Sequence, residues 1–115
     1  MKTQKKDSPV SVLMARALGL AGLVNYQDGA VVSKTIIKKK TGTVTLFAFA
    51  KGEGLSTHSA PFDALVQILD GEAKITVAGK PLKVGEGEMV IMPANKPHAL
   101  KALKPFKMML VMVKS

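Results

Sequence analysis

The chain has 115 residues, of which 47% are hydrophobic, and this combination suits one folded domain rather than a disordered chain. It contains no cysteine, which excludes disulfides and cysteine-bound zinc and makes a reducing cytoplasm the expected compartment. The net charge of +9 comes almost entirely from lysine. Arg16 is the only arginine and tryptophan is absent. The chain therefore has few side chains that bind a phosphate through two hydrogen bonds or stack on a base, and we expect no specific nucleic-acid binding.

Residues 1–29 are predicted to form a loose tail and a short helix that packs on the rest of the protein. Ser8 can cap this helix and Pro9 suits its first turn. Apolar residues then recur at helical spacing and give one face for packing: Leu13, Ala17, Leu20 and Val24. A cleaved signal peptide stays open as an alternative, because lysines precede an apolar run over residues 10–24. That run is too short and too charged to span a bilayer, so no membrane contact is expected.

From residue 30 to residue 115 the pattern changes to short strands, and we predict a single all-β domain there. The strand-like segments are rich in β-branched and apolar residues and cover about 31–39, 43–50, 64–69, 73–77, 82–84, 88–92, 99–103 and 106–113. Turn formers such as Asp70-Gly71 separate them. About eight short strands with turns at close spacing are typical of a sandwich or jelly roll.

Two segments, each containing one of the only two histidines, carry further information. Both place the histidine beside turn formers, at a fixed distance from an upstream glycine. The spacings resemble the two sequence motifs of the cupin family, and the matching positions are Gly52, His58, Gly71, Gly87, Pro93 and His98. This resemblance implies a double-stranded β-helix, or jelly-roll barrel, over residues 30–115, with the short N-terminal helix outside it.

The sequence departs from the family pattern at four positions. Ala60 and Ala64 stand where the family motif has its second histidine and its glutamate. In the second motif, Asn95 replaces a glycine and Ala102 stands at the asparagine position. Two of the four metal-ligand positions that the resemblance implies are therefore without a ligand.

The cofactor question depends on His58 and His98, which the resemblance makes the candidate metal ligands. Imidazole binds divalent transition metals, so zinc, iron, manganese, nickel or copper is the cofactor to consider. A catalytic site usually has three protein ligands, and the third would come from Asp63, Gln67 or a bound substrate. The alternative is a pair of histidines without metal that forms hydrogen bonds to a polar ligand.

The alternation of side chains along a strand suggests which residues face the interior of the barrel. It places Ala64, Val66 and Ile68 inside and Asp63 and Gln67 on the opposite face, unless a bend at Pro61 shifts the register. Gln67 is unusual in an apolar strand, and soft methionine side chains line adaptable pockets. The candidate ligand-binding residues are His58, His98, Gln67, Met89 and Met92.

Three functions follow as hypotheses. The first is a barrel that binds a small molecule at a mouth marked by His58 and His98, without proven catalysis. The second is a metal-dependent enzyme of the dioxygenase, isomerase or decarboxylase type, acting on a small polar or anionic substrate. The third is an interaction or regulatory module. The resemblance also implies a homodimer, and strands that are apolar on both faces agree with this.

Overall fold

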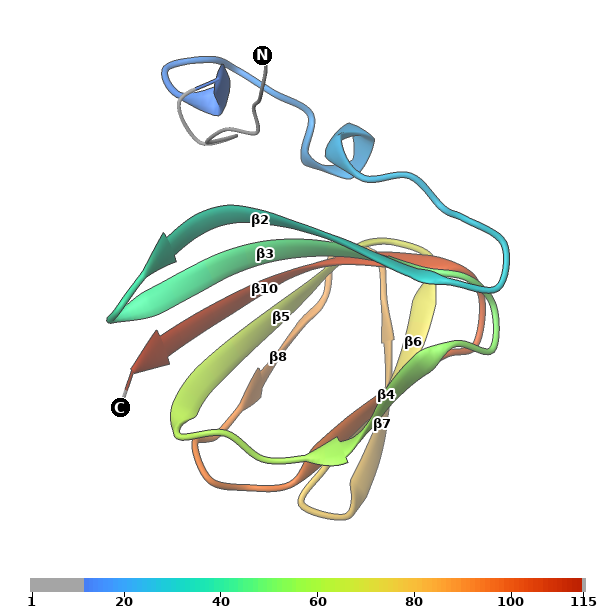
Figure 1. Cartoon of the computed structure of the whole chain (residues 1–115). Helices are drawn as coiled ribbons and strands as arrows, with labels where there is room; N and C mark the ends of the chain where they lie inside the picture. The colour runs from blue at the N-terminus through green and yellow to red at the C-terminus, as the bar shows by residue number, and fades with distance from the viewer. Residues whose placement is uncertain (1–11, 115) are drawn as a thin grey trace.

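The structure is a computed structural model that describes residues 12–114 (Figure 1). It contains one short 3-10 helix, η1 (Leu20–Leu23), and nine strands. The strands are β2 (Val31–Lys39), β3 (Gly42–Phe49), β4 (Gly54–His58), β5 (Phe62–Asp70), β6 (Glu72–Val77), β7 (Lys80–Gly85), β8 (Met89–Met92), β9 (His98–Ala102) and β10 (Phe106–Lys114). Within residues 12–114, no helix is long and apolar enough to cross a membrane.

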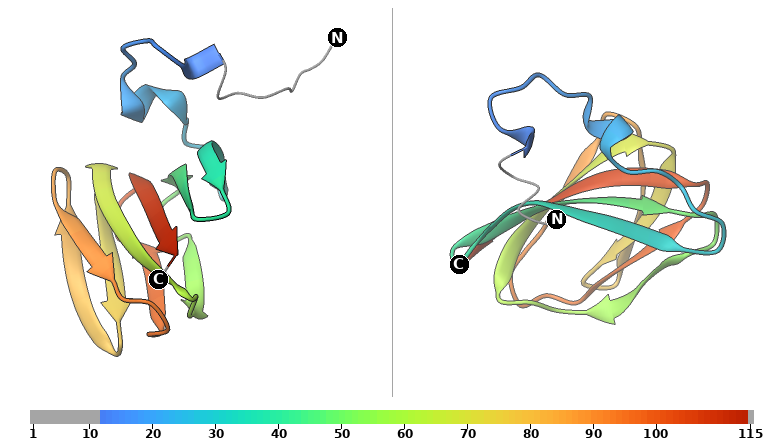
Figure 2. Two further views of the ribbon diagram at one scale, coloured as in Figure 1. Left: turned by 90° about the vertical axis from the view of Figure 1, so that its left-hand side faces the viewer. Right: turned by 45° about the horizontal axis from the view of Figure 1, so that its top comes forward.

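The strands form two antiparallel sheets that face each other. One sheet has the order β2-β3-β10-β5-β8 and the other has the order β4-β9-β6-β7. Figures 1 and 2 show that the two sheets close around a common interior. The predicted all-β jelly-roll fold is therefore confirmed.

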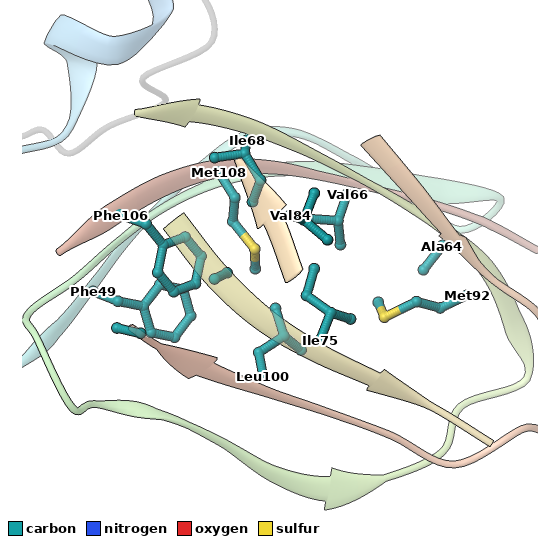
Figure 3. Close-up of a cluster of buried hydrophobic side chains, with 12 residues drawn as sticks. Phe49, Ala64, Val66, Ile68, Ile75, Val84, Met92, Leu100, Phe106 and Met108 are labelled. Carbon is teal, nitrogen blue, oxygen red and sulfur yellow. The ribbon is translucent and has the colours of Figure 1, made fainter. Parts of the chain in front are cut away.

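The strand alternation expected from the sequence decides which side chains fill this interior. In β5, Ala64, Val66 and Ile68 are buried. Together with residues from the facing sheet they form the main core, whose largest members include Phe49 and Phe106 (Figure 3). These two rings stack with centroids 4.4 Å apart and an interplanar angle of 6°. One end of the barrel interior is therefore tightly filled by aromatic rings.

A tight approach of the backbone joins β5 to β6. Gly71 follows Asp70 in the left-handed conformation, with φ at 79°. A Cβ atom at Gly71 would overlap the carbonyl oxygen of Pro105 in the segment before β10. Glycine is required here for two reasons, because the backbone angle disfavours a side chain and no space exists for one.

The N-terminal helix predicted from the sequence needs correction. Among residues 12–29, helical geometry is confined to residues 12–13 and to η1, which has only 4 residues. The backbone turns out of helical geometry at Ala15, where φ is 57°, and Gly19 and Gly22 add further helix-weakening positions. The predicted capping residues Ser8 and Pro9 lie outside the described residues.

The segment around η1 nevertheless packs on the outer face of the five-stranded sheet. Val24 is buried there against Leu46 and Ala48, which form a second, smaller core. The Tyr26 hydroxyl donates a hydrogen bond to the Asp70 carboxylate at 2.5 Å. This segment therefore covers part of the sheet that faces away from the barrel interior.

Candidate functional site

The two histidines meet at one end of the barrel because their strands are neighbours. His58 is the last residue of β4 and His98 is the first residue of β9, and the two are register partners. The β4–β9 pairing shifts its register between Leu55 and His58. Such irregularities commonly redirect side chains beside functional sites. The result is that residues 40 positions apart in the sequence bring their rings into contact.

Hydrogen bonds to the backbone fix the tautomer of both rings. The Nδ1 atom of His58 lies 2.7 Å from the carbonyl oxygen of Ser56, and the Nδ1 atom of His98 lies 3.2 Å from that of Lys96. A carbonyl oxygen only accepts hydrogen bonds, so each Nδ1 must carry the hydrogen. In the neutral rings, each Nε2 is then left with a lone pair.

The two Nε2 atoms point toward one another. They lie 3.2 Å apart, and the ring planes meet at 71°. Two lone pairs at this distance repel unless something positive lies between or beside them. A proton on one ring, a hydrogen-bond donor from a ligand, or a metal ion each meets that requirement.

The two rings differ in their exposure to solvent. His98 is buried, with 7% of its surface exposed, whereas His58 is exposed. Burial lowers the pKa of His98 below its usual value, and the charge on His58 lowers it further, while the hydrogen bond to the Lys96 carbonyl opposes this shift. Burial therefore favours the neutral form of His98, which has a lone pair on Nε2.

A small pocket opens beside the histidine pair. Its other lining residues are apolar and come from both sheets and from the segment between β4 and β5: Leu55, Ala60, Phe62, Ala64, Met92, Leu100, Met108, Leu110 and Met112. The space available to the centre of a water-sized sphere is about 40 Å³. This exceeds the 10–15 Å³ or so that one water needs, and it suits the end of a small molecule. Among the lining residues in the described part of the chain, the two imidazoles are the only polar side chains.

Ala60 and Ala64 lie on the wall of this pocket. These are the positions where the cupin motif has a second histidine and a glutamate. Their methyl groups offer nothing to a metal ion and make that wall apolar. Within residues 12–114, no group of three or more His, Asp or Glu side chains is placed to hold a metal ion.

The structure distributes the other predicted site residues differently. Met92 lines the pocket beside the histidines. Gln67 and Met89 are register partners on the opposite face of the sheet, away from the pocket, and Met89 is 53% exposed. Asp63 accepts a hydrogen bond from the backbone N–H of Ala94 at 2.9 Å, which ties down the loop between β8 and β9. Gln67 therefore lies on the face away from the histidine pair, and one carboxylate oxygen of Asp63 is bonded to the backbone of this loop.

The residues that sequence reasoning missed are the aliphatic and aromatic side chains of the pocket wall: Leu55, Phe62, Leu100 and Leu110. They come from four different strands, and nothing in their local sequence marks them as lining a pocket rather than the core. The alternation along β10 is the one available signal. It places Met108, Leu110 and Met112 together on the inward face.

Comparison with known proteins agrees with this architecture. The family model described as "Cupin domain" matches residues 45–114. The chain belongs to the cupin family. The resemblance read from the spacing around the two histidines is thereby confirmed.

Three similar proteins place this cupin among its relatives. It is 35% identical over 80 residues to a pyrimidine/purine nucleoside phosphorylase from Geobacter sulfurreducens, a match covering 68% of this chain and 75% of the relative. A conserved protein of unknown function from Streptococcus pyogenes is 39% identical, with a TM-score of 0.85 and coverage of 88% of this chain and 89% of that one. A cupin 2 conserved barrel domain protein from Leptotrichia buccalis is 48% identical, with a TM-score of 0.82 over 84% of this chain. This cupin spans only 47% of the Leptotrichia protein.

Proposed function

We propose that this cupin is a small-molecule-binding barrel in which His58 and His98 together hold a polar group of the ligand. The observation that carries the proposal is the convergence of two Nε2 lone pairs, 3.2 Å apart, in a pocket that is otherwise apolar. Both tautomers are fixed by backbone carbonyls. When both rings are neutral, the pair therefore forms a preorganised acceptor for a donor from a ligand.

The chemistry of the pair favours a ligand with a hydroxyl or another hydrogen-bond donor. A donor placed between the two rings bonds to one or both lone pairs and removes their mutual repulsion. Leaving such groups desolvated and unpaired is unfavourable, so a bound donor contributes more here than in water. The apolar wall then contacts the carbon atoms beside that donor.

The proposal is tested by titrating the protein with isopropanol, which combines one hydroxyl with a small apolar body. NMR follows the ring carbon-bound hydrogens of both histidines and the methyl signals of the pocket residues Met92 and Met112, which can still be measured when both histidines are replaced. We expect both sets of signals to shift together and to saturate. The His58→Gln, His98→Gln double variant is expected to lose this saturable response.

Met89→Leu serves as the matched control, because Met89 lies on the opposite face of the sheet and is 53% exposed. This variant should bind isopropanol as the wild type does. If the double variant binds isopropanol with unchanged affinity, the histidines are not the binding point and the proposal fails.

A second candidate function is that of a metal-dependent cupin enzyme, which the same two nitrogens favour. Two zinc–nitrogen bonds of about 2.0–2.1 Å at a tetrahedral angle span about 3.3 Å, close to the 3.2 Å between the Nε2 atoms. Hydrogen bonds from Nδ1 to backbone carbonyls are also the usual outer partners of metal-bound histidines. His58 and His98 would hold the ion, and water or substrate would complete its coordination. When bound, such a metal polarises a substrate oxygen or activates a water.

Elemental analysis tests this candidate on protein purified without an affinity tag or chelator. About one equivalent of a transition metal, lost in the His58→Gln, His98→Gln variant, would support the enzyme. Protein that remains metal-free after incubation with zinc would count against it.

The Geobacter relative suggests a third candidate, phosphorolysis of a nucleoside. The pocket as it stands admits the end of a molecule rather than a whole nucleoside, since only about 40 Å³ is open to the centre of a water-sized sphere. Incubation with uridine or inosine and inorganic phosphate, followed by detection of the free base, tests the idea. Release of free base that depends on phosphate and on His98 would make this the preferred function.

A further inference from the structure

Strands β2 and β3 carry several hydroxyl residues on their inner face, beside the aromatic residues of the core. On β3, Phe47 and Phe49 pack with the main core, so the alternating positions Thr43 and Thr45 share the inward face. Leu46, between them, belongs to the outer cluster under the N-terminal segment. The hydroxyls of this part of β3 therefore face the barrel side, while aliphatic side chains face outward.

Strand β2 continues the same pattern. Its register partners are Ser33 with Phe47 and Thr35 with Thr45, so both hydroxyl residues share the inward face. Val32 and Ile36 pack in the outer cluster instead. Four side chains thus form one inward-facing hydroxyl ladder, which consists of Ser33, Thr35, Thr43 and Thr45.

The hydroxyl ladder adjoins the histidine pocket through β10. Thr45 is the register partner of Leu110, and Thr43 is the register partner of Met112. Leu110 and Met112 both line the pocket. Figure 1 shows that the ends of β2, β3 and β10 extend beyond the four-stranded sheet, and Ser33 and Thr35 on this stretch are exposed to solvent.

One hydroxyl of the ladder lacks a hydrogen-bond partner. The Thr43 hydroxyl oxygen is buried and has no hydrogen-bond partner among residues 12–114. A buried hydroxyl without a partner is unfavourable unless a bound molecule supplies that partner. Valine has almost the same shape as threonine and forms strands equally well. A bound hydroxyl would supply that partner for Thr43, while Ser33 and Thr35 are exposed and can bond to water or to a ligand.

We propose that the ligand site extends from the histidine pair across Leu110 and Met112 onto the hydroxyl ladder, and that it selects a neutral, polyhydroxylated, sugar-like molecule. This inference rests on the proposed function. Hydroxyls both donate and accept but carry no charge, so they match the hydroxyls of such a ligand. The two strands of the ladder lie about 4.8 Å apart, and successive inward positions along one strand lie about 7 Å apart. A sugar ring with its hydroxyls has similar dimensions. Leu110 and Met112 lie where the ring's C–H groups would be.

D-ribose is the probe, and isopropanol is the comparison ligand that reaches only the histidines. In an NMR titration, ribose is expected to shift the backbone amides of Thr35 and Thr45 together with the ring signals of His98. It should also bind at least tenfold more tightly than isopropanol. The Thr35→Val, Thr45→Val double variant should weaken ribose binding at least tenfold and leave isopropanol binding unchanged.

Two further variants separate recognition from folding. Thr76→Val makes the same change on β6, on the outer face of the other sheet, and should bind ribose normally. Thr45→Ser keeps the hydroxyl and should retain most of the ribose affinity. A dispersed amide spectrum identifies each variant as folded.

These experiments separate a failure of the sugar-binding inference from a failure of the proposed function. If isopropanol binds but ribose does not, or if the valine double variant binds ribose as tightly as the wild type, the ladder is not a recognition surface and the inference is overturned. If neither ligand perturbs the histidines, the proposed function itself fails. Loss of ribose binding in the valine variant alone, with isopropanol binding retained, supports the inference.

Discussion

The Nε2 atoms of His58 and His98 lie 3.2 Å apart, and each ring has its other nitrogen bound to a backbone carbonyl. Neither ring can turn its lone pair away without losing that hydrogen bond. The carbonyls of Ser56 and Lys96 therefore hold the two lone pairs together. The pair is a product of the β4–β9 pairing rather than of either sequence segment alone.

The buried position of His98 makes the stability of the metal-free protein depend on pH. Burial and the charge on His58 lower the pKa of folded His98, whereas the unfolded chain has the usual value of about 6.5. Below about pH 6.5 the unfolded state therefore binds more protons than the folded state, and stability falls as pH falls. We expect urea unfolding to show this loss between pH 7.5 and pH 5, with chelator present.

His98→Leu is the comparison that isolates this contribution, because carboxylates elsewhere affect both proteins alike. The variant should lose less stability than the wild type over the same pH range. Equal losses in the two proteins would contradict the assigned burial of a neutral His98.

Restoring the family ligands should create a metal site. Ala60 and Ala64 both line the pocket beside the histidines, so Ala60→His and Ala64→Glu would add a nitrogen and a carboxylate to the existing pair. Loss of a single hydrogen-bond partner of a metal ligand typically costs about 10–100-fold in affinity. Adding two ligands is thus expected to tighten zinc binding more than about 100-fold, as measured by competition with a chromogenic chelator. Unchanged affinity would mean that these two positions do not point at the histidines.

The two cupin sequence motifs predicted the barrel, and the alternation of side chains predicted the inward face of β5. Both predictions succeeded because they depend on residues close together in the sequence. The histidine pair was predicted as a site from the family spacing. Its convergent geometry was not, since it depends on the register between β4 and β9. Gln67 was selected for being polar in an apolar strand, but it points away from the pocket. The homodimer and the cytoplasmic location stay predictions, because one copy of the chain carries no information on either.

The two turn glycines at Gly71 and Gly79 should respond differently to alanine. Both have positive φ, at 79° and 82°, so alanine at either costs roughly 1–2 kcal/mol for the left-handed backbone. At Gly79 nothing lies within 4 Å of the new Cβ, whereas at Gly71 it overlaps the Pro105 carbonyl. Urea unfolding should show that Gly71→Ala costs more than about twice as much as Gly79→Ala. Equal costs would mean that β10 can move away from the β5–β6 turn freely.

Tyr26 reports on the packing of the N-terminal segment. Burial raises the pKa of its hydroxyl above the usual value of about 10, and the hydrogen bond to Asp70 and that residue's charge raise it further. Because the chain has only 1 tyrosine, absorbance near 295 nm follows this group alone. We expect ionisation above pH 10 in the native protein and near pH 10 in urea, with Asp70→Asn between the two. Ionisation near pH 10 in the native protein would show that the segment does not stay on the sheet.

The measurement that tests the central claim most directly is an NMR spectrum of the ring nitrogens of His58 and His98 above pH 7.5, before and after addition of isopropanol. The account predicts that both rings carry the hydrogen on Nδ1, that both Nε2 signals are those of lone-pair nitrogens, and that the alcohol shifts the two Nε2 signals together. A ring with its hydrogen on Nε2, or a response confined to one histidine, would contradict the claim that the pair acts as one binding point.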